Sequence, residues 1–236
     1  MRLLRASPME RILICAAMVL LARAIRPASV AAQEVAVSYR IEPARSAIYV
    51  VTHRTGLLSF LDHDHAILAT EWSGALCWAP DLPRQGHGTV EVAAGALVID
   101  TDTARAVAGL RGGPSPGQMR ELQAKLLDPD HLDAARYPVL TLSVDRLAES
   151  IDDGLVAHGR LRIRDRIRNV EFPLQVAASP DSVRFSGVLR VPQTSFGIRP
   201  ESVAAVVKVA DVVDIHFDLL GVSTRVPCSD RTQAVH

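Results

Sequence analysis

The chain has 236 residues, of which 26 are lysine or arginine and 26 are aspartate or glutamate, so its formal net charge is zero. A chain without a basic excess is not expected to bind nucleic acid, which demands a concentrated basic surface to displace phosphate counterions. The length suits one all-β domain, and no repeat of about 20 to 50 residues indicates a solenoid.

Residues 1–32 are predicted to be a secretory signal peptide. Three arginines come before an apolar run over residues 12–21, and small residues close the segment at 30–32. That run is about half the length that a membrane-spanning helix needs, which argues against a permanent anchor. We expect cleavage after Ala32, so that the mature protein folds outside the cytoplasm with a formal charge of −4.

Two cysteines, Cys77 and Cys228, remain once Cys15 has left with the leader. In an oxidising compartment they can pair and tie the C-terminal segment to an early strand. The alternative is two unpaired thiols, and the sequence leaves both open.

Apolar residues recur at every second position from residue 35 onward, which is the period of a strand with one buried face. In chain order the predicted elements are strands near 35–41, 46–52, 72–78 and 88–99, a helix at 118–127, and strands near 139–146, 155–164, 169–177, 183–191 and 213–219. About eight or nine strands predict an antiparallel sheet closed or nearly closed on itself, because an open sheet of that size leaves exposed edges. The helix follows a Gly/Pro-rich breaker at 112–117 and covers part of that sheet.

Seven segments in order resemble the YceI family. They are Tyr39–Ser46, Ile48–His53, Trp72–Leu76, Val98–Asp102, Leu126–Pro138, Gly159–Arg164 and Gln193–Ile198. The resemblance covers roughly residues 35–222. It divides the chain into a signal peptide at 1–32, a barrel domain at 35–222 and a polar C-terminal tail at 223–236.

This resemblance implies an all-β fold: an extended antiparallel lipocalin-like β-barrel of about eight strands, with a short helix in one long connection. It also implies a periplasmic protein that holds a polyisoprenoid or another long-chain lipid in an apolar cavity. Secretion beyond the cell stays open. The segment at 57–67 departs from the family's common pattern.

The ligand-binding prediction rests on the inward faces of the strands. The candidate lining residues are Leu161, Ile163, Phe185, Leu189, Ile215 and Phe217. The resemblance adds His53, at the end of the second strand, as a contact for a ligand head group at a barrel mouth. Its alternative is a partly buried histidine that hydrogen-bonds to a backbone carbonyl.

A second hypothesis concerns His63 and His65. Residues two apart on an extended segment project to one face, so the two imidazoles can bind one transition metal such as copper or zinc. His53 is the candidate third ligand. The alternative is a polar hairpin with solvated histidines, or histidines that bond to Asp62 and Asp64; under the leading hypothesis no cofactor is expected.

Five arginines recur at every second position, at 160, 162, 164, 166 and 168. One interpretation is a basic stripe that contacts anionic phospholipid head groups. The other is a solvated outer face paired with carboxylates such as Asp165 and Glu171.

No nucleophile elbow, zinc-protease motif or P-loop is present, so the sequence predicts no enzyme. The leading hypothesis is a non-enzymatic carrier of one long apolar small molecule, with at most transient membrane contact and a homodimer left open. The metal-binding protein is the alternative. A third hypothesis is an enzyme whose substrate is the bound lipid.

Overall fold

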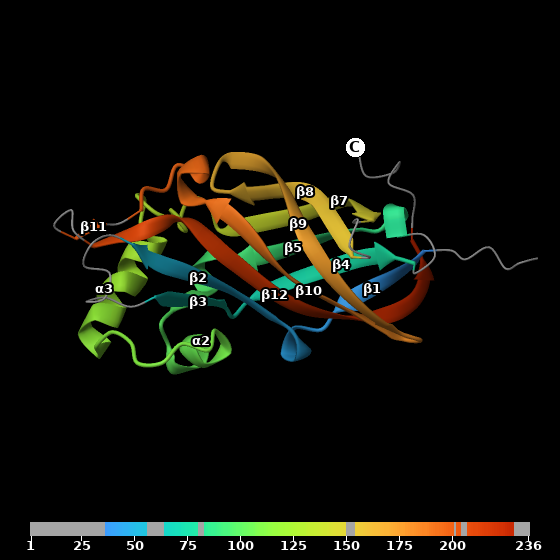
Figure 1. Cartoon of the computed structure of the whole chain (residues 1–236), viewed down its shortest axis with the longest axis horizontal. Helices are drawn as coiled ribbons and strands as arrows, with labels where there is room; N and C mark the ends of the chain where they lie inside the picture. Colours follow the sequence, from blue (N-terminus) through green and yellow to red (C-terminus); the bar gives the residue numbers. More distant parts are fainter. Residues whose placement is uncertain are drawn as a thin grey trace, which may run out of the picture. The chain divides into compact units, whose positions relative to one another are not determined.

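The computed structural model in Figure 1 describes residues 36–55, 64–79, 83–149, 154–200, 202–203 and 207–228. The predicted signal peptide and His63 lie outside these residues. The strands are β1 (Val37–Ile41), β2 (Ala47–Thr55), β3 (His65–Ala69), β4 (Trp72–Trp78), β5 (His87–Ala93), β6 (Leu97–Ile99), β7 (Val139–Glu149), β8 (Leu155–Ile163), β9 (Arg166–Ser179), β10 (Ser182–Pro192), β11 (Ser202–Val203) and β12 (Val207–Pro227). The helices are α2 (Asp102–Val107) and α3 (Pro116–Leu127), with single 3-10 turns η1 (Pro43–Arg45), η3 (Pro83–Gln85), η4 (Ala94–Ala96) and η5 (Gln193–Phe196).

Eight antiparallel strands form a closed barrel. They follow one another around the ring in the order β1, β4, β5, β7, β8, β9, β10 and β12, and pairing of β12 with β1 closes the ring. The predicted fold class, an all-β antiparallel barrel of about eight strands, is confirmed. Alternation is also confirmed on β8, where Ala157, Leu161 and Ile163 are buried and Arg160 and Arg162 are exposed.

Strand β12 is 21 residues long and pairs with two different strands along one edge. Its last part pairs with β1, up to Val37 opposite Pro227, and its middle pairs with β2, from Ala47 opposite Asp218 to Thr55 opposite Lys208. Strands β3 and β6 then continue the sheet beyond β2. We call this three-stranded extension the β2 end of the barrel.

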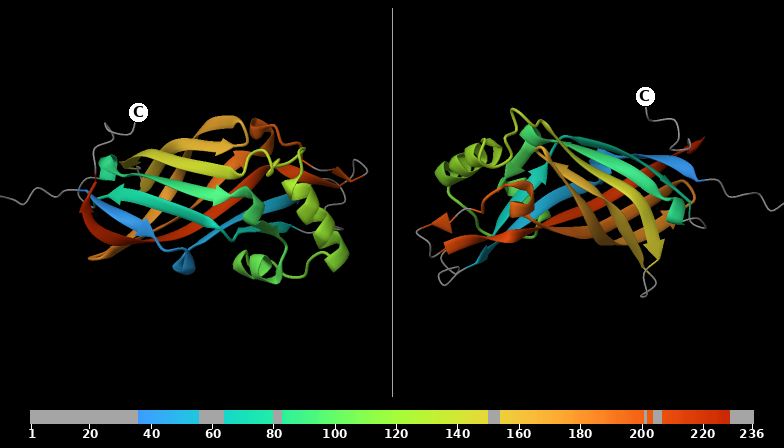
Figure 2. Two further views of the ribbon diagram at one scale, coloured as in Figure 1. Left: turned by 180° about the vertical axis from the view of Figure 1, so that it is seen from behind. Right: turned by 90° about the horizontal axis from the view of Figure 1, so that it is seen from above.

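Two α-helices lie at the β2 end, away from β1 (Figure 2). Helix α3 begins with a capping box: the Ser115 hydroxyl accepts a hydrogen bond from the Gln118 backbone N–H, the Gln118 side chain bonds back to Ser115, and Pro116 occupies the first turn. The predicted helix at 118–127 is therefore confirmed, with a start two residues earlier. None of the helices within the described ranges is long and apolar enough to cross a bilayer.

The strand predicted near 88–99 is divided by turn η4 into β5 and β6, of which only β5 belongs to the ring. Three other differences concern α2, β3 and the C-terminal segment. Helix α2 was not predicted, because six residues are too few to show a 3.6-residue period. Strand β3 was not predicted either. The third difference is the C-terminal segment: β12 continues to Pro227 through its pairing with β1, so residues 223–227 are strand rather than tail.

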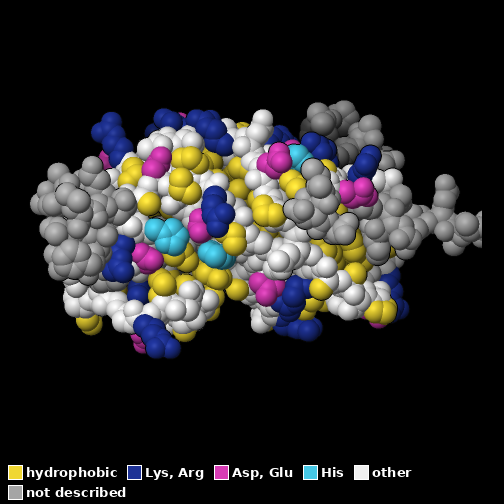
Figure 3. Space-filling view, in the orientation of Figure 1, with side chains coloured by type: hydrophobic (Ala, Val, Ile, Leu, Met, Phe, Trp, Pro, Cys, Tyr) yellow, Lys and Arg dark blue, Asp and Glu magenta, His cyan; other side chains and the backbone are white. Residues whose placement is uncertain are grey.

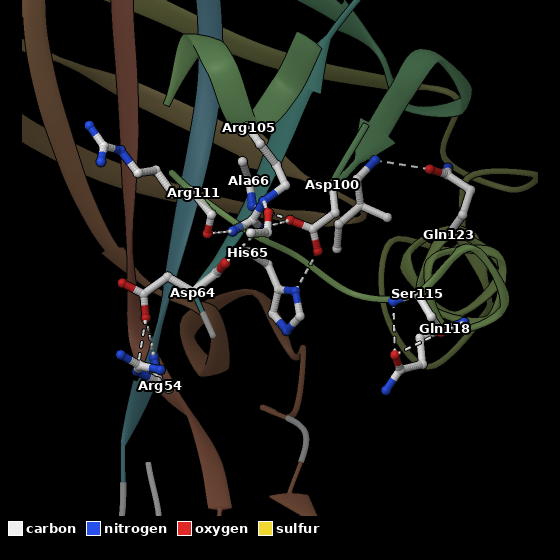
Figure 4. Close-up of polar contacts among 12 residues, drawn as sticks. Arg54, Asp64, His65, Ala66, Asp100, Arg105, Arg111, Ser115, Gln118 and Gln123 are labelled. Atoms are coloured by element: carbon white, nitrogen blue, oxygen red, sulfur yellow. Dashed lines mark hydrogen bonds and ion pairs between the residues drawn. The ribbon is translucent and has the colours of Figure 1, made fainter. Parts of the chain in front are cut away.

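A buried ionic clamp, formed by His65, Asp100 and Arg105, holds the β2 end together (Figure 4). The Asp100 side chain is fully buried and accepts hydrogen bonds from His65 Nδ1 at 2.5 Å, Arg105 Nη1 at 2.6 Å and the Ala66 backbone N–H at 3.0 Å. Arg105 also donates to the Asp64 carbonyl oxygen. The clamp thereby connects the start of β3, the residue after β6 and helix α2.

Asp100 is held in its charged form. Burial alone would raise the pKa of this carboxyl, but the hydrogen bonds from His65, Ala66 and Arg105 outweigh burial, so its pKa lies below the ordinary value of 3.8. Its backbone has φ of 52°, in the left-handed region that Asp and Asn tolerate better than other side chains. Strain and burial together mark Asp100 as a residue that the surrounding contacts must stabilise.

Cys77 and Cys228, whose pairing the sequence left open, form a disulfide with a Cα–Cα distance of 5.9 Å. The Cys228 backbone N–H also donates to the Ala36 carbonyl oxygen at 2.9 Å. The disulfide joins β4 to the residue after β12 at the end of the barrel opposite the clamp. The C-terminal end of the closing strand β12 is therefore fixed by a contact beyond the ladder.

The Cys77→Ser, Cys228→Ser double variant should lose about 2 to 5 kcal/mol of unfolding free energy, because the disulfide restricts the unfolded chain across 151 residues of sequence. Thermal unfolding of the mature protein measures the loss. Reductant should lower the Tm of the wild type and leave that of the double variant unchanged. Equal Tm values for both proteins without reductant would contradict a stabilising disulfide.

Asp100→Asn keeps a residue that tolerates positive φ but removes the charge, and should cost about 3 to 5 kcal/mol at pH 7 by leaving Arg105 without its buried partner. Because the folded pKa of Asp100 is depressed, its stabilisation is complete above pH 3.8 and is lost as pH falls through the folded value. The difference in denaturant midpoint between wild type and variant should therefore shrink in acid. Asp218→Asn, at a half-exposed pair with Arg184, is the matched control and should cost at most about 1 kcal/mol.

Candidate functional site

An apolar cavity of about 180 Å³ lies inside the barrel. Each strand of the ring contributes side chains to its wall at alternate positions, for example Leu76 on β4, Val90 on β5, Leu142 on β7 and Phe172 on β9. A water-sized group needs about 10 to 15 Å³ on this measure, so the cavity has room for about a dozen such groups.

Small inward residues help to keep this space empty. Ala69 and Ala157 line the cavity and are buried, and Gly88 lines it without a side chain. Two aromatic edge-to-face pairs, Trp78 with Phe185 and Phe172 with Phe217, pack around the same space. The interior is thus partly packed and partly open, as expected of a small barrel with the size to hold one ligand.

All six apolar residues predicted to line a cavity do line it. They are Leu161, Ile163, Phe185, Leu189, Ile215 and Phe217. The prediction rested on strand alternation alone. The same alternation also holds for lining residues that were not named from sequence, such as Val50 and Leu142, and Ile67 was missed because β3 was not predicted.

One polar atom of the wall has no hydrogen-bond partner. The indole nitrogen of Trp78 is buried and unpartnered, and within the described ranges only Arg164 Nε shares this condition. An unsatisfied buried donor is costly, and this nitrogen has almost no accessible surface, so the lining of the cavity stays apolar at Trp78. Sequence reasoning had no signal for it.

His53 does not line the cavity. It projects from the outer face of β2, where its Nδ1 lies 3.4 Å from Asp64 Oδ2 and its Nε2 lies 3.4 Å from Asp214 Oδ2. The mouth contact that the resemblance implied is therefore not what this geometry provides. Parity explains this position: Ile48 and Val50 of β2 line the cavity opposite Phe217 and Ile215 of β12, and His53 has the opposite parity.

His216 lies beside His53 on the outer face, and Figure 3 shows histidine and acidic side chains together over β2 and β12. Its ring stacks on Tyr49 with centroids 4.7 Å apart. Burial first, and then the neighbouring His53 and Arg190, lower the pKa of His216, against the opposing effect of Asp214. This imidazole is therefore neutral at pH 7.

The structure does not bring His53 and His65 together. His65 belongs to the clamp, with its side chain 12% exposed, whereas His53 projects from the other side of the sheet. His63 is outside the described residues. Within the described ranges, no group of three His, Cys, Asp or Glu side chains is placed to hold a metal ion.

The predicted arginine stripe is divided between two faces. Arg162 pairs with Ile167 and Ile163 pairs with Arg166 across the β8–β9 turn. Arg160 and Arg162 therefore share the outer face with Ile167, whereas Arg166 and Arg168 fall on the side of Ile163 and Leu161. The two-residue turn pairs odd-numbered residues of β8 with even-numbered residues of β9. Even-numbered arginines therefore change face between the two strands.

Comparison with known proteins gives a consistent answer. The family model described as "YceI-like domain" matches residues 39–220. Among curated proteins none matches this sequence. The crystal structure of Burkholderia cenocepacia BcnA is similar at 18% identity and a TM-score of 0.60, covering 76% of this chain and 98% of that one.

A Campylobacter jejuni YceI protein is similar at 13% identity and a TM-score of 0.50, covering 66% of this chain and 83% of that one. At these identities the two solved structures establish a shared fold and nothing further. The family match spans most of the chain and covers at least part of each of the eight strands of the ring. On that match, this chain belongs to the YceI-like domain family.

Proposed function

We propose that the protein is an exported, non-enzymatic binding protein that holds one long apolar ligand in the barrel cavity. The observation that carries the proposal is the cavity itself: a closed barrel whose inward side chains are apolar and leave about 180 Å³ unfilled. Wall residues such as Leu161, Leu189 and Phe217 would contact the ligand chain. The ligand class is an isoprenoid-like or fatty-acid-derived molecule.

The energy of binding would come from burial of apolar surface. Moving a chain of about a dozen methylenes from water into the cavity is favoured by roughly 0.8 kcal/mol of free energy per methylene. The total is about 10 kcal/mol before the cost of association is subtracted. This is enough for useful affinity even after several kcal/mol are lost to immobilisation. A polar end group would then decide which ligand is preferred.

Export to the periplasm is part of the proposal. The predicted leader at 1–32 motivates it. The Cys77–Cys228 disulfide supports it, because such bonds form and persist in oxidising compartments.

A transition-metal protein remains the second candidate, for one observation. His65 Nδ1 is held by the Asp100 carboxylate, and metal-binding imidazoles are oriented by carboxylates in this way. His63 would supply the second imidazole. The His63→Ala, His65→Ala variant should then lose stoichiometric copper or zinc in elemental analysis, and equal metal content in the variant and the wild type would remove this candidate.

Native mass spectrometry of the mature protein, purified from the exported fraction without chelator, should show one lipid of several hundred daltons bound per chain. Denaturing extraction would release it for identification. A protein that carries no lipid, and that also fails to bind palmitic acid or geranylgeraniol when they are added, would contradict the carrier function.

Filling the cavity should abolish binding while the barrel stays folded. Val90→Phe and, separately, Leu142→Phe add bulk at half-buried wall positions. Each variant should bind palmitic acid about tenfold or more weakly, because loss of about two buried methylenes has that effect. The measurement is displacement of a bound polyene fatty acid by palmitic acid. Ala177→Phe, at an exposed position of β9, is the matched control. Wild-type affinity in both cavity variants, with unchanged Tm, would place the ligand elsewhere.

A further inference from the structure

The turn between β8 and β9 concentrates positive charge. Residues 162–168 contain four arginines and one aspartate, in a chain whose total charge is zero. The turn itself is Arg164–Asp165, with Ile163 opposite Arg166. On the face drawn in Figure 3, basic side chains gather along the upper left edge, the region where Figure 1 places this hairpin.

Three of these arginines lack a carboxylate partner. Across the described part of the chain, no Asp or Glu oxygen lies within ion-pair distance of Arg162, Arg166 or Arg168. Two of them bond to neutral groups: Arg162 donates to the Thr141 hydroxyl and Arg168 to the Ile167 carbonyl. Arg160, two residues before Arg162 on β8, does have a carboxylate partner: it forms two hydrogen bonds to Asp145, at 3.0 and 3.1 Å. The charge at the tip is therefore not neutralised internally.

Apolar side chains accompany the charge. Ile167 is 54% exposed and lies beside Arg162 on the outer face, and Val139, on the neighbouring strand β7, is 37% exposed. An exposed aliphatic side chain at a hairpin end that carries arginines on both faces has the composition of a segment that contacts lipid head groups and inserts one residue below them. Arg162, Ile167 and Val139 lie on the outer face of the hairpin, and Arg166 and Arg168 lie on its other face, so guanidinium groups surround the hairpin end from both sides. We call these five residues, at the end of the β8–β9 hairpin, the hairpin patch.

The patch adjoins a part of the barrel wall without strand pairing. Strand β9 pairs with β10 only from Leu174 opposite Gly187 toward Ser179, so residues 166–173 have no partner on that edge. The last pair of this ladder is Gly187 with Leu174, and beyond it the two strands are no longer paired. The backbones are still close at this point, since a Cβ added at Gly187 would lie 2.6 Å from the Pro173 carbonyl oxygen. Turn η5 contacts β9 beyond this point, and the Arg166 guanidinium lies against Gly197 at its end.

We propose that the hairpin patch docks the protein on a bilayer surface rich in anionic phospholipid. Charge complementarity selects this occupant: the unpaired guanidinium groups match phosphate oxygens, and Ile167 matches the acyl boundary. Phe172 and Leu189 flank the unpaired wall and also line the cavity, so docking here brings the cavity wall to the membrane. Only this last point rests on the proposed function; the docking itself does not.

Sedimentation with vesicles tests the proposal on the full mature protein. Wild type should bind vesicles of equal phosphatidylglycerol and phosphatidylcholine, bind pure phosphatidylcholine vesicles at least tenfold more weakly, and be released from the anionic vesicles by 0.5 M salt, a condition in which exposed charges about 10 Å apart are screened. The Arg162→Gln, Arg166→Gln, Arg168→Gln variant should bind the anionic vesicles about a hundredfold more weakly, since each arginine near such a surface contributes about fivefold. Ile167→Ser should bind them several-fold more weakly at unchanged net charge.

The matched control removes three arginines at other exposed positions. Arg40→Gln, Arg84→Gln, Arg225→Gln changes the net charge equally at side chains that are 71%, 80% and 80% exposed, and should bind as wild type does. Equal loss in both triple variants, or no loss in the hairpin variant, would overturn the proposal. Palmitic acid binding in vesicle-free solution separates the two ideas: it should be unchanged in the hairpin variant, and its failure in wild type would contradict the cavity function alone.

Discussion

The backbone ladder between β1 and β12 closes the barrel, and the cavity exists only while that ladder holds. It joins residues 37–41 to residues 221–227, so the first and last strands of the ring must meet before an interior is formed. Closure across so long a loop is entropically expensive. The Cys77–Cys228 disulfide lies at this closure, and its loss would weaken the one contact on which every inward side chain depends.

The opposite end of the barrel is held by different chemistry. There the sheet continues through β3 and β6, which have five and three residues and form few ladder hydrogen bonds. The buried clamp of His65, Asp100 and Arg105 compensates by joining these short strands to α2. The polar groups of this clamp are satisfied mainly by one another and by backbone carbonyls, so the cavity beside it can stay apolar.

Period-two alternation was sufficient to predict the barrel and six residues of the cavity wall, because every regular strand must place alternate side chains inside. Alternation did not predict which face a side chain lies on where that face depends on the pairing between two strands. The turn at Arg164–Asp165 inverts parity, so Arg162 and Arg166 face opposite sides although both are even-numbered. Helix α2 was missed because it is held by the clamp and not by an amphipathic face.

Under the proposed function, the unfavourable step for a lipid is the passage through water. An apolar wall and the hydrocarbon of a bilayer are similar solvents, so moving a chain from one to the other changes its free energy little. Each methylene exposed in between costs roughly 0.8 kcal/mol, so a dozen of them would slow transfer by many orders of magnitude. A carrier therefore gains most by contact with the membrane close to its cavity. Since the mature protein would carry a formal charge of −4, its net charge does not attract it to an anionic bilayer, and a local basic excess such as that at residues 162–168 would decide which part of the barrel meets the bilayer.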